Sequence, residues 1–375
     1  MPLRRSGAAA GKASLSSLFP GYSVQLYDSG TAALATALND ARLRHESTQP
    51  EAILPAYGCP QLVSACLYAN VRPRVVDTAA GQWGYALESL RSALTPHTVA
   101  IVAANLLGTG DQAADLLPLA RGNGSYLIQD SAQHVPSRVP PAWCADYVIL
   151  SFGRGKPVNL LRGGALAVPG RQPLLADAPL MGGLRDLLGE RALASRTAAA
   201  AFNLITDPRV YGFATRLPGL GLGETRYSPV ERIARLPLSA WRQVGPGWEK
   251  YGLEPWASPW SGVLPEWEKR GIHELTCATT APPAADRRLR LALLASGRGL
   301  RDRIVRMLGH RGLGASNMYG SAIDSIDAIP AEVARQGPFP NATDLAERLF
   351  TLPTHAAVTA DIVRQTHECL RALVG

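Results

Sequence analysis

The sequence predicts an α/β protein with a mainly parallel sheet that carries helices on both faces, followed by a smaller C-terminal α+β domain. Between residues 24 and 168, short apolar runs alternate with helical stretches, which is the pattern of consecutive βαβ units. The chain has 375 residues, and because single cores stop growing near roughly 250–300 residues, two domains are expected. Ligands of such sheets bind at the carboxyl ends of the strands.

Within the alternating region, apolar runs rich in β-branched residues are expected to be strands, and longer runs rich in alanine and leucine are expected to be helices. The expected strands are Glu51–Pro55, Pro73–Asp77, Val99–Ala104, Tyr126–Gln129 and Tyr147–Phe152. The expected helices are Thr31–Leu43, Gln61–Ala69, Ala86–Leu94 and Ala113–Ala120.

The second half of the chain is less regular. Glycine and proline interrupt residues 170–265 at Leu217–Gly223 and Gly245–Gly247, after a helical stretch at Leu184–Ala201. A boundary near residue 245 gives a large domain, residues 1–245, and a small domain, residues 246–375. The elements expected in the small domain are a strand at Arg288–Leu294 and helices at Leu300–Leu308 and Thr359–Leu373.

Composition argues against several classes of function. The net charge is +8, but the arginines are scattered and no basic run is interleaved with aromatic residues, so nucleic acid is not an expected partner. Hydrophobic residues make up 46% of the chain and the mean hydropathy is close to zero, as in soluble globular proteins. No window approaches roughly 18 apolar residues and the N-terminus lacks the apolar stretch of a secretion signal, so no membrane partner is expected.

The five cysteines form no CxxC pair, and no cluster of histidines accompanies them. This pattern argues against a zinc site and against a disulfide framework. We therefore expect no bound metal and a reducing compartment, the cytoplasm.

Lys156 is the first candidate catalytic residue. Only four of the 38 basic residues are lysines, and this one follows the apolar run Tyr147–Phe152 and lies between Gly155 and Pro157. Lysine is needed where a nitrogen must lose its proton and attack a carbonyl, so the setting suggests Schiff-base chemistry. Taken alone, a lysine at a strand end is more often a snorkelling or ion-paired surface residue.

Asp28–Thr31 forms the second candidate element, directly before the alanine-rich helix. Ser29 or Asp28 can cap this helix, Gly30 lets the backbone approach a ligand, and the free amides with the helix dipole favour a phosphate. Most sequences of this kind are ordinary helix caps.

Asp130 is the third candidate, at the end of the strand Tyr126–Gln129, where its carboxylate is expected to point into the crevice. It could be a metal ligand, a general base, a ribose-binding group, the partner of a protonated pyridine nitrogen or the cap of a following helix. The residue alone leaves these alternatives open.

The three candidates are expected at adjacent strand ends, with Lys156 placed 26 residues after Asp130. A lysine, a carboxylate and a phosphate cradle are the three anchors that pyridoxal 5'-phosphate (PLP) requires, at C4', N1 and the phosphate. Their occurrence together favours a PLP site over three separate structural roles.

Five segments in order resemble motifs of the DegT/DnrJ/EryC1/StrS sugar aminotransferases, a family of fold type I PLP enzymes, and the resemblance runs nearly end to end. The segments are Ser29–Leu34 (SGTxAL), Leu54–Gly58 with Arg72–Asp77 (P-A-Y-T … P-V-x-V-D), Gln129–Gln133 (E-D-A-A-Q), Ser151–Gly164 (S-F-x-x-x-K … G-G) and the C-terminal pieces Gly312–Tyr319, Phe339–Ala342 and Leu352–His355.

The resemblance implies the PLP-dependent transferase fold, which is like that of aspartate aminotransferase, and an aminotransferase activity. Glutamate would be the usual donor, and a nucleotide-linked keto-sugar in polysaccharide or secondary-metabolite biosynthesis would be the acceptor. The implied catalytic residues are Lys156, as the Schiff-base lysine and proton carrier, and Asp130, at N1 of the ring. Gln133 would lie against the ring, and the phosphate would be held by the N-terminus of the helix at Gly30 together with Thr31, Ala32 and Ser151. The site would be shared across a homodimer.

Three positions depart from the family pattern. The aromatic residue that stacks on the ring is replaced by Cys59, so Tyr57 is the nearest aromatic candidate for that role. Arg162 stands where an acidic residue precedes the paired glycines, and no asparagine matches the G-Y-N segment around Arg226–Ser228. These departures leave open a PLP-dependent sugar dehydratase, or a catalytically silent relative that binds sugar nucleotides.

Several further residues have simpler explanations. His134 could act on a substrate or merely cap a helix or face solvent, and Asn105 could face the cofactor or end its strand. His355 and Trp241 are expected to be structural.

Overall fold

A computed structural model describes residues 19–134, 143–170, 173–175, 177–179, 225–236, 258–280 and 288–374 of the chain. Four features discussed above lie outside these residues: the helical stretch Leu184–Ala201, the break at Leu217–Gly223, Trp241 and the boundary at residue 245.

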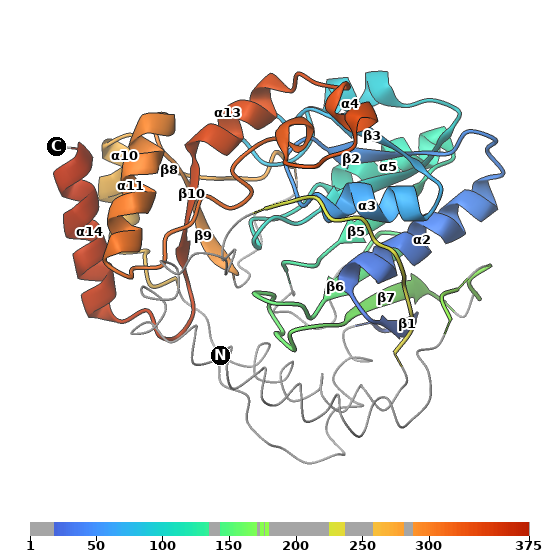
Figure 1. The fold of residues 1–375 in the computed structure, drawn as a ribbon, viewed down its shortest axis with the longest axis horizontal. Helices are drawn as coiled ribbons and strands as arrows, with labels where there is room; N and C mark the ends of the chain where they lie inside the picture. The colour runs from blue at the N-terminus through green and yellow to red at the C-terminus, as the bar shows by residue number, and fades with distance from the viewer. Residues whose placement is uncertain are drawn as a thin grey trace, which may run out of the picture.

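The larger unit is built on a seven-stranded sheet in the order β1-β7-β6-β5-β4-β2-β3 (Figure 1). Its strands are β1 (Tyr22–Tyr27), β2 (Glu51–Pro55), β3 (Arg72–Val76), β4 (Thr98–Ala104), β5 (Tyr126–Asp130), β6 (Tyr147–Ser151) and β7 (Gly164–Pro169). Only β7 runs antiparallel to its neighbours β1 and β6. The prediction of a mainly parallel sheet is confirmed, although β1 and β7 were not among the predicted strands.

Helices cover both faces of this sheet, as predicted. Helices α2 (Gly30–His45) and α3 (Gln61–Tyr68) share a core with Ala52 and Leu54 of β2. Helices α4 (Leu87–Ala93) and α5 (Ala113–Asn123) share another core with Ile53. Ile53 stands between Ala52 and Leu54 in the sequence of β2. Successive side chains of a strand point to opposite faces, so the apolar run of β2 supplies both cores.

The C-terminal part contains a three-stranded antiparallel sheet in the order β10-β9-β8, formed by β8 (His273–Glu274), β9 (Arg290–Leu294) and β10 (Leu349–Pro353). Helices α10 (Leu264–Lys269), α11 (Arg298–His310) and α14 (Ala360–Val374) gather beside it (Figure 1). Trp260, Trp267 and Phe350 belong to a separate core there. The predicted α+β unit is therefore present.

Three short elements connect the two sheets: η2 (Ile323–Ser325), α12 (Ala331–Ala334) and α13 (Pro340–Arg348). The Gln336 side chain accepts a hydrogen bond from Val75 N at 2.9 Å and donates one to Pro73 O at 2.8 Å, on the outer edge of β3. Asp77 accepts hydrogen bonds from Asn341 N at 3.1 Å and Ala342 N at 2.9 Å, at the start of α13. The Gln336 side chain thus pairs with backbone groups of the edge strand β3 that would otherwise have no partner.

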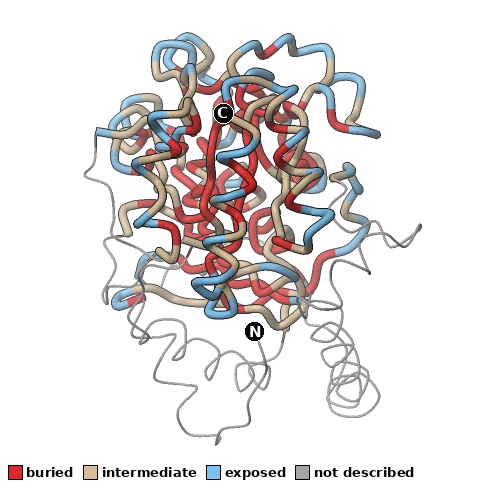
Figure 2. The backbone as a smooth tube through the Cα atoms, turned by 90° about the vertical axis from the view of Figure 1, so that its left-hand side faces the viewer, coloured by how far each residue is buried: buried red, intermediate tan, exposed pale blue. Residues whose placement is uncertain are grey.

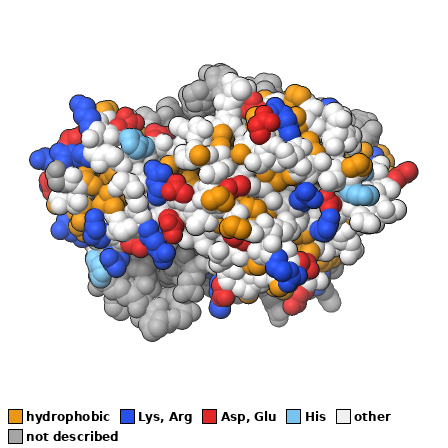
Figure 3. Space-filling view, turned by 90° about the horizontal axis from the view of Figure 1, so that it is seen from above, with side chains coloured by type: hydrophobic (Ala, Val, Ile, Leu, Met, Phe, Trp, Pro, Cys, Tyr) orange, Lys and Arg blue, Asp and Glu red, His pale blue; other side chains and the backbone are white. Residues whose placement is uncertain are grey.

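Buried segments run through the centre of the molecule and exposed ones lie at its periphery (Figure 2). On the face shown in Figure 3, basic and acidic side chains are interspersed. Within the described ranges, no helix combines the length and apolar character needed to cross a membrane. The same residues contain no group of three or more histidine, cysteine, aspartate or glutamate side chains arranged for a metal ion. The five cysteines are all free thiols.

Candidate active site

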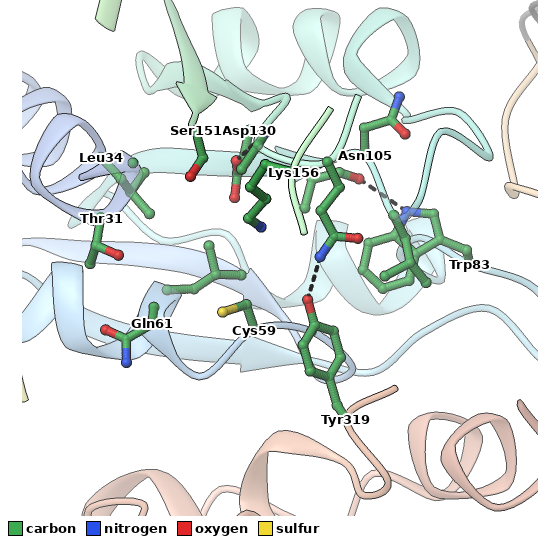
Figure 4. A pocket seen from close by; sticks show the side chains of 17 residues that line it. Thr31, Leu34, Cys59, Gln61, Trp83, Asn105, Asp130, Ser151, Lys156 and Tyr319 are labelled. Atoms are coloured by element: carbon green, nitrogen blue, oxygen red, sulfur yellow. Dashed lines mark hydrogen bonds between the residues drawn. The ribbon is translucent and has the colours of Figure 1, made fainter. Parts of the chain in front are cut away.

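A cavity of about 160 Å³ lies at the carboxyl ends of the central strands. The strand order reverses between β2 and β4, and residues from the loops after both strands line the cavity, so it occupies the switch point where such sheets bind ligands. Its lining includes seven of the eight predicted site residues: Gly30, Thr31, Cys59, Asp130, Gln133, Ser151 and Lys156. In Figure 4, Lys156, Asp130 and Ser151 enter from one side, and Cys59 and Tyr319 face them.

The N-terminus of α2 forms one wall. Ser29 caps this helix, because its Oγ accepts a hydrogen bond from Ala32 N at 3.0 Å. Ala32, the eighth predicted site residue, is fully buried and is not part of the cavity lining, so its amide serves the helix cap. Gly30 and Thr31 do line the cavity, where the positive end of the helix dipole favours an anion.

Glycine is required where α2 meets β7 and β6. A Cβ on Gly30 would lie 2.8 Å from Ser151 Cβ, and a Cβ on Gly164 would lie 2.5 Å from Gly30 N and 2.6 Å from its Cα. Contacts this short force a backbone shift. The close approach therefore fixes the helix N-terminus against Ser151, the strand-end hydroxyl that shares the same wall.

Gly164→Ala is expected to lower the free energy of unfolding by about 1–3 kcal/mol, the usual cost of overpacking. Gly299→Ala in the first turn of α11 is the matched control, since no atom lies within 4 Å of the added Cβ, and it should leave stability unchanged or raise it by about 0.5–1 kcal/mol. Urea unfolding of both variants measures the difference. Equal stability of the two would contradict the close approach described above.

Asp130 ends β5 and projects into the cavity (Figure 4). Its Oδ1 accepts a hydrogen bond from Ala132 N at 3.0 Å. Burial raises the pKa of this carboxyl, while the Ala132 N–H and the charge of Lys156 act in the opposite direction. Residues 131–134 are not helical, so Asp130 caps a local turn there instead of a helix. A cationic partner in the cavity would stabilise the carboxylate further.

Lys156 reaches the cavity from the turn after β6. Lys156 N donates to Gly153 O at 3.3 Å, and Gly155 has φ +67°, a conformation that favours glycine. The side chain extends toward the middle of the cavity (Figure 4). Across the described ranges, no ion pair links Lys156 to a carboxylate, so the alternative of an ion-paired surface lysine finds no support.

Gln133 is held at both ends of its carboxamide. Gln133 Oε1 accepts a hydrogen bond from Leu107 N at 3.1 Å, and Gln133 Nε2 donates to the Tyr319 hydroxyl at 2.6 Å. Tyr319 lies in the segment Gly312–Tyr319 that resembles the family, but no sequence pattern predicts its place beside Gln133. Other lining residues, among them Gln61, Leu106 and Trp83, were also not predicted.

Cys59 lines the cavity at the position of the missing aromatic residue, but the expectation that Tyr57 could replace that ring is wrong. Tyr57 is fully buried behind the lining, with its ring edge-on to Trp83 at 6.2 Å and to Tyr319 at 5.5 Å between centroids. Tyr57 lies in the bend after β2 and belongs to the main core cluster.

The other two positions that depart from the family pattern, Arg162 and the segment Arg226–Ser228, are not part of the cavity lining. Arg162 is exposed and does not line the cavity. The backbone oxygen of Ser228 accepts a hydrogen bond from Gln61 Nε2 at 3.2 Å, so the segment that replaces G-Y-N lies beside a lining residue. Arg226 in this segment pairs with Asp327 at 2.8 Å.

Among the lesser candidates, Asn105 lines the cavity, yet its side chain contacts its own loop through Gly108 N at 3.1 Å and Asp111 at 3.4 Å. His134 is buried, and neither His134 nor His355 lines the cavity.

Comparison of the sequence with protein families shows that residues 23–175 match the DegT/DnrJ/EryC1/StrS aminotransferase family. One curated relative is the UDP-N-acetyl-3-dehydro-alpha-D-glucosamine 3-aminotransferase of Acidithiobacillus ferrooxidans, which is 28% identical over 111 residues. That match covers 30% of this chain and spans only 29% of the relative's length.

Solved structures match over almost the whole chain. A DegT DnrJ EryC1 StrS aminotransferase from Brucella abortus has a TM-score of 0.65 at 16% identity, covering 98% of this chain and 90% of its own. The sugar aminotransferase CalS13 from Micromonospora echinospora has a TM-score of 0.65 at 17% identity, covering 97% and 91%. NtdA from Bacillus subtilis with bound cofactor PMP has a TM-score of 0.64 at 16% identity, covering 94% and 73%. The predicted PLP-dependent transferase fold is thereby confirmed.

Proposed function

We propose, from the match of residues 23–175 to the DegT/DnrJ/EryC1/StrS aminotransferase family, that this chain is a PLP-dependent aminotransferase. Its acceptor would be a nucleotide-linked keto-sugar and its donor an amino acid, with glutamate the expected one. The observation that carries the proposal is the single cavity lined by Lys156, Asp130 and the N-terminus of α2.

The residues of the cavity fit PLP. Lys156 supplies a primary amine in the part of the cavity that Asp130 also faces, and the helix N-terminus at Gly30 and Thr31 offers amides to a phosphate. Burial raises the pKa of Asp130, so a protonated pyridine nitrogen would complement this carboxylate, whose Oδ1 accepts a hydrogen bond from Ala132 N at 3.0 Å. When bound, PLP supplies an electron sink for the carbon that loses its proton.

Each side chain then has a role that its position supports. Lys156 Nζ would bind the cofactor's aldehyde carbon, and once released it would carry a proton to and from the substrate carbon. Asp130 would hold the proton on the ring nitrogen. Thr31 and Ser151 would bind the phosphate at the end of α2, and Gln133 would lie along the ring, fixed by Leu107 and Tyr319.

Two further features belong to the proposal. A homodimer with shared sites is expected from the family resemblance, and analytical ultracentrifugation of the purified protein measures it. Five free cysteines support a reducing compartment such as the cytoplasm.

The function is tested by adding PLP and then glutamate to the purified protein. We expect a visible absorption band with PLP, fixation of the cofactor on Lys156 by borohydride, and release of 2-oxoglutarate with glutamate. A panel of nucleotide keto-sugars then identifies the acceptor. Failure to bind PLP would refute the proposal. Cofactor binding without 2-oxoglutarate release would favour the dehydratase.

A further inference from the structure

Tyr319 comes from the C-terminal part of the chain but completes the wall of a cavity that belongs to the main sheet. It is presented by a tight turn in which Gly320 N donates to Asn317 O at 3.2 Å. Met318 and Gly320 on either side of it both have positive φ, at 54° and 75°. A non-glycine residue in this conformation is uncommon, so the turn holds the tyrosine in a defined direction. The hydroxyl meets Gln133 inside the cavity (Figure 4).

The hydrogen bonds at this wall have a fixed direction. Leu107 N donates to Gln133 Oε1, and Gln133 Nε2 donates to the Tyr319 oxygen at 2.6 Å. The carboxamide is therefore held at both ends, by the loop after β4 and by the C-terminal part of the chain.

Packing and hydrogen bonding of Tyr319 can be separated. Its ring contacts Tyr57 edge-on, with centroids 5.5 Å apart and planes at 61°. Phenylalanine at position 319 would keep this ring contact and lose only the hydroxyl. Tyr57 does not line the cavity, so removal of its hydroxyl provides a matched control within the same aromatic pair.

We propose that Tyr319 is a positioning residue whose hydroxyl orients the Gln133 carboxamide toward the cofactor. The cavity wall is then complete only when the C-terminal unit is docked. The effect on the cofactor rests on the proposed function.

The first test compares the PLP affinity of the wild type with that of the control variant Tyr57→Phe, by titration of the visible absorption band. Tyr57 does not line the cavity, so Tyr57→Phe should bind PLP as tightly as the wild type.

The second test measures PLP affinity in a double-mutant cycle. Tyr319→Phe should weaken PLP binding about 3–10-fold, the usual effect of one hydrogen bond. In a Gln133→Ala background the same change should have no further effect, because the tyrosine acts on the cofactor through the glutamine.

The outcomes separate the two proposals. An unchanged PLP affinity in Tyr319→Phe, or equal losses of affinity in Tyr319→Phe and Tyr57→Phe, would overturn the positioning role. Additive losses of PLP affinity in the cycle would also overturn it. If the wild-type protein takes up no PLP, the proposed function fails; if the wild type binds PLP and Tyr319→Phe binds it equally well, only the positioning role fails.

Discussion

Lys156→Ala is expected to abolish covalent attachment of PLP and to lower transaminase activity by at least about 10³-fold. The loss is large because one amine serves both as the attachment point and as the proton carrier. Borohydride treatment followed by peptide mass spectrometry measures the attachment, and release of 2-oxoglutarate from glutamate measures the activity. Folding should be unaffected, since Lys156 contributes no ion pair in the described part of the structure.

Two controls sharpen this experiment. Lys156→Arg keeps the positive charge, but its guanidinium stays protonated and cannot attack a carbonyl, so it should be as inactive as the alanine variant. Lys269→Ala removes an exposed lysine at the end of α10 and should behave like the wild type. Borohydride fixation of PLP on another lysine in Lys156→Ala would contradict the assignment.

Asp130→Asn is expected to have opposite effects on stability and on activity. Burial raises the folded-state pKa of Asp130 above its ordinary value, so the ionised carboxylate is less favourable in the folded protein than in the unfolded chain. The resulting destabilisation grows as pH rises from the ordinary pKa through the folded one and is full above it. Asparagine removes this cost while keeping an oxygen for Ala132 N, so the cofactor-free variant should gain about 0.5–1 kcal/mol at neutral pH.

With PLP present, Asp130→Asn should be harmful instead of stabilising. A neutral amide cannot hold the ring nitrogen protonated, so we expect weaker PLP binding and an activity loss of about 10²-fold. Urea unfolding of the cofactor-free proteins at neutral pH and near pH 3.5 checks the first effect, which should disappear in acid. Asp344→Asn, which lies on the exposed side of α13, is the control. A cofactor-free Asp130→Asn protein less stable than the wild type at neutral pH would contradict this account.

The half of the cavity that contains Lys156, Asp130, Ser151 and the start of α2 could be predicted because each of these residues follows an apolar strand or begins a helix. Asp130 and Ser151 end β5 and β6, and parallel strands bring such ends to one edge of the sheet. The neighbouring β7 escaped prediction because its start, Gly163–Gly164, looks like a loop in sequence, although a tight contact with Gly30 requires a glycine there.

The facing half of the cavity depends on contacts that the sequence does not display. Tyr319 is separated from Gln133 by 186 positions, and only the docking of the C-terminal unit brings them together. Ala32 was assigned to the phosphate, but the Ser29 side chain already occupies its amide. Tyr57 was the nearest aromatic candidate for the ring, but it is fully buried in the core.

The hydrogen bonds of Gln336 to β3 bear on how the protein is made. Gln336 is 261 positions later in the chain than Val75, so a ribosome exposes the whole main sheet before it synthesises the side chain that covers its edge. Until then β3 presents open backbone groups to other nascent chains. We expect truncation before residue 336 to yield an aggregating fragment, and Gln336→Ala to lower the yield of soluble protein during expression more than it lowers the stability of the finished fold.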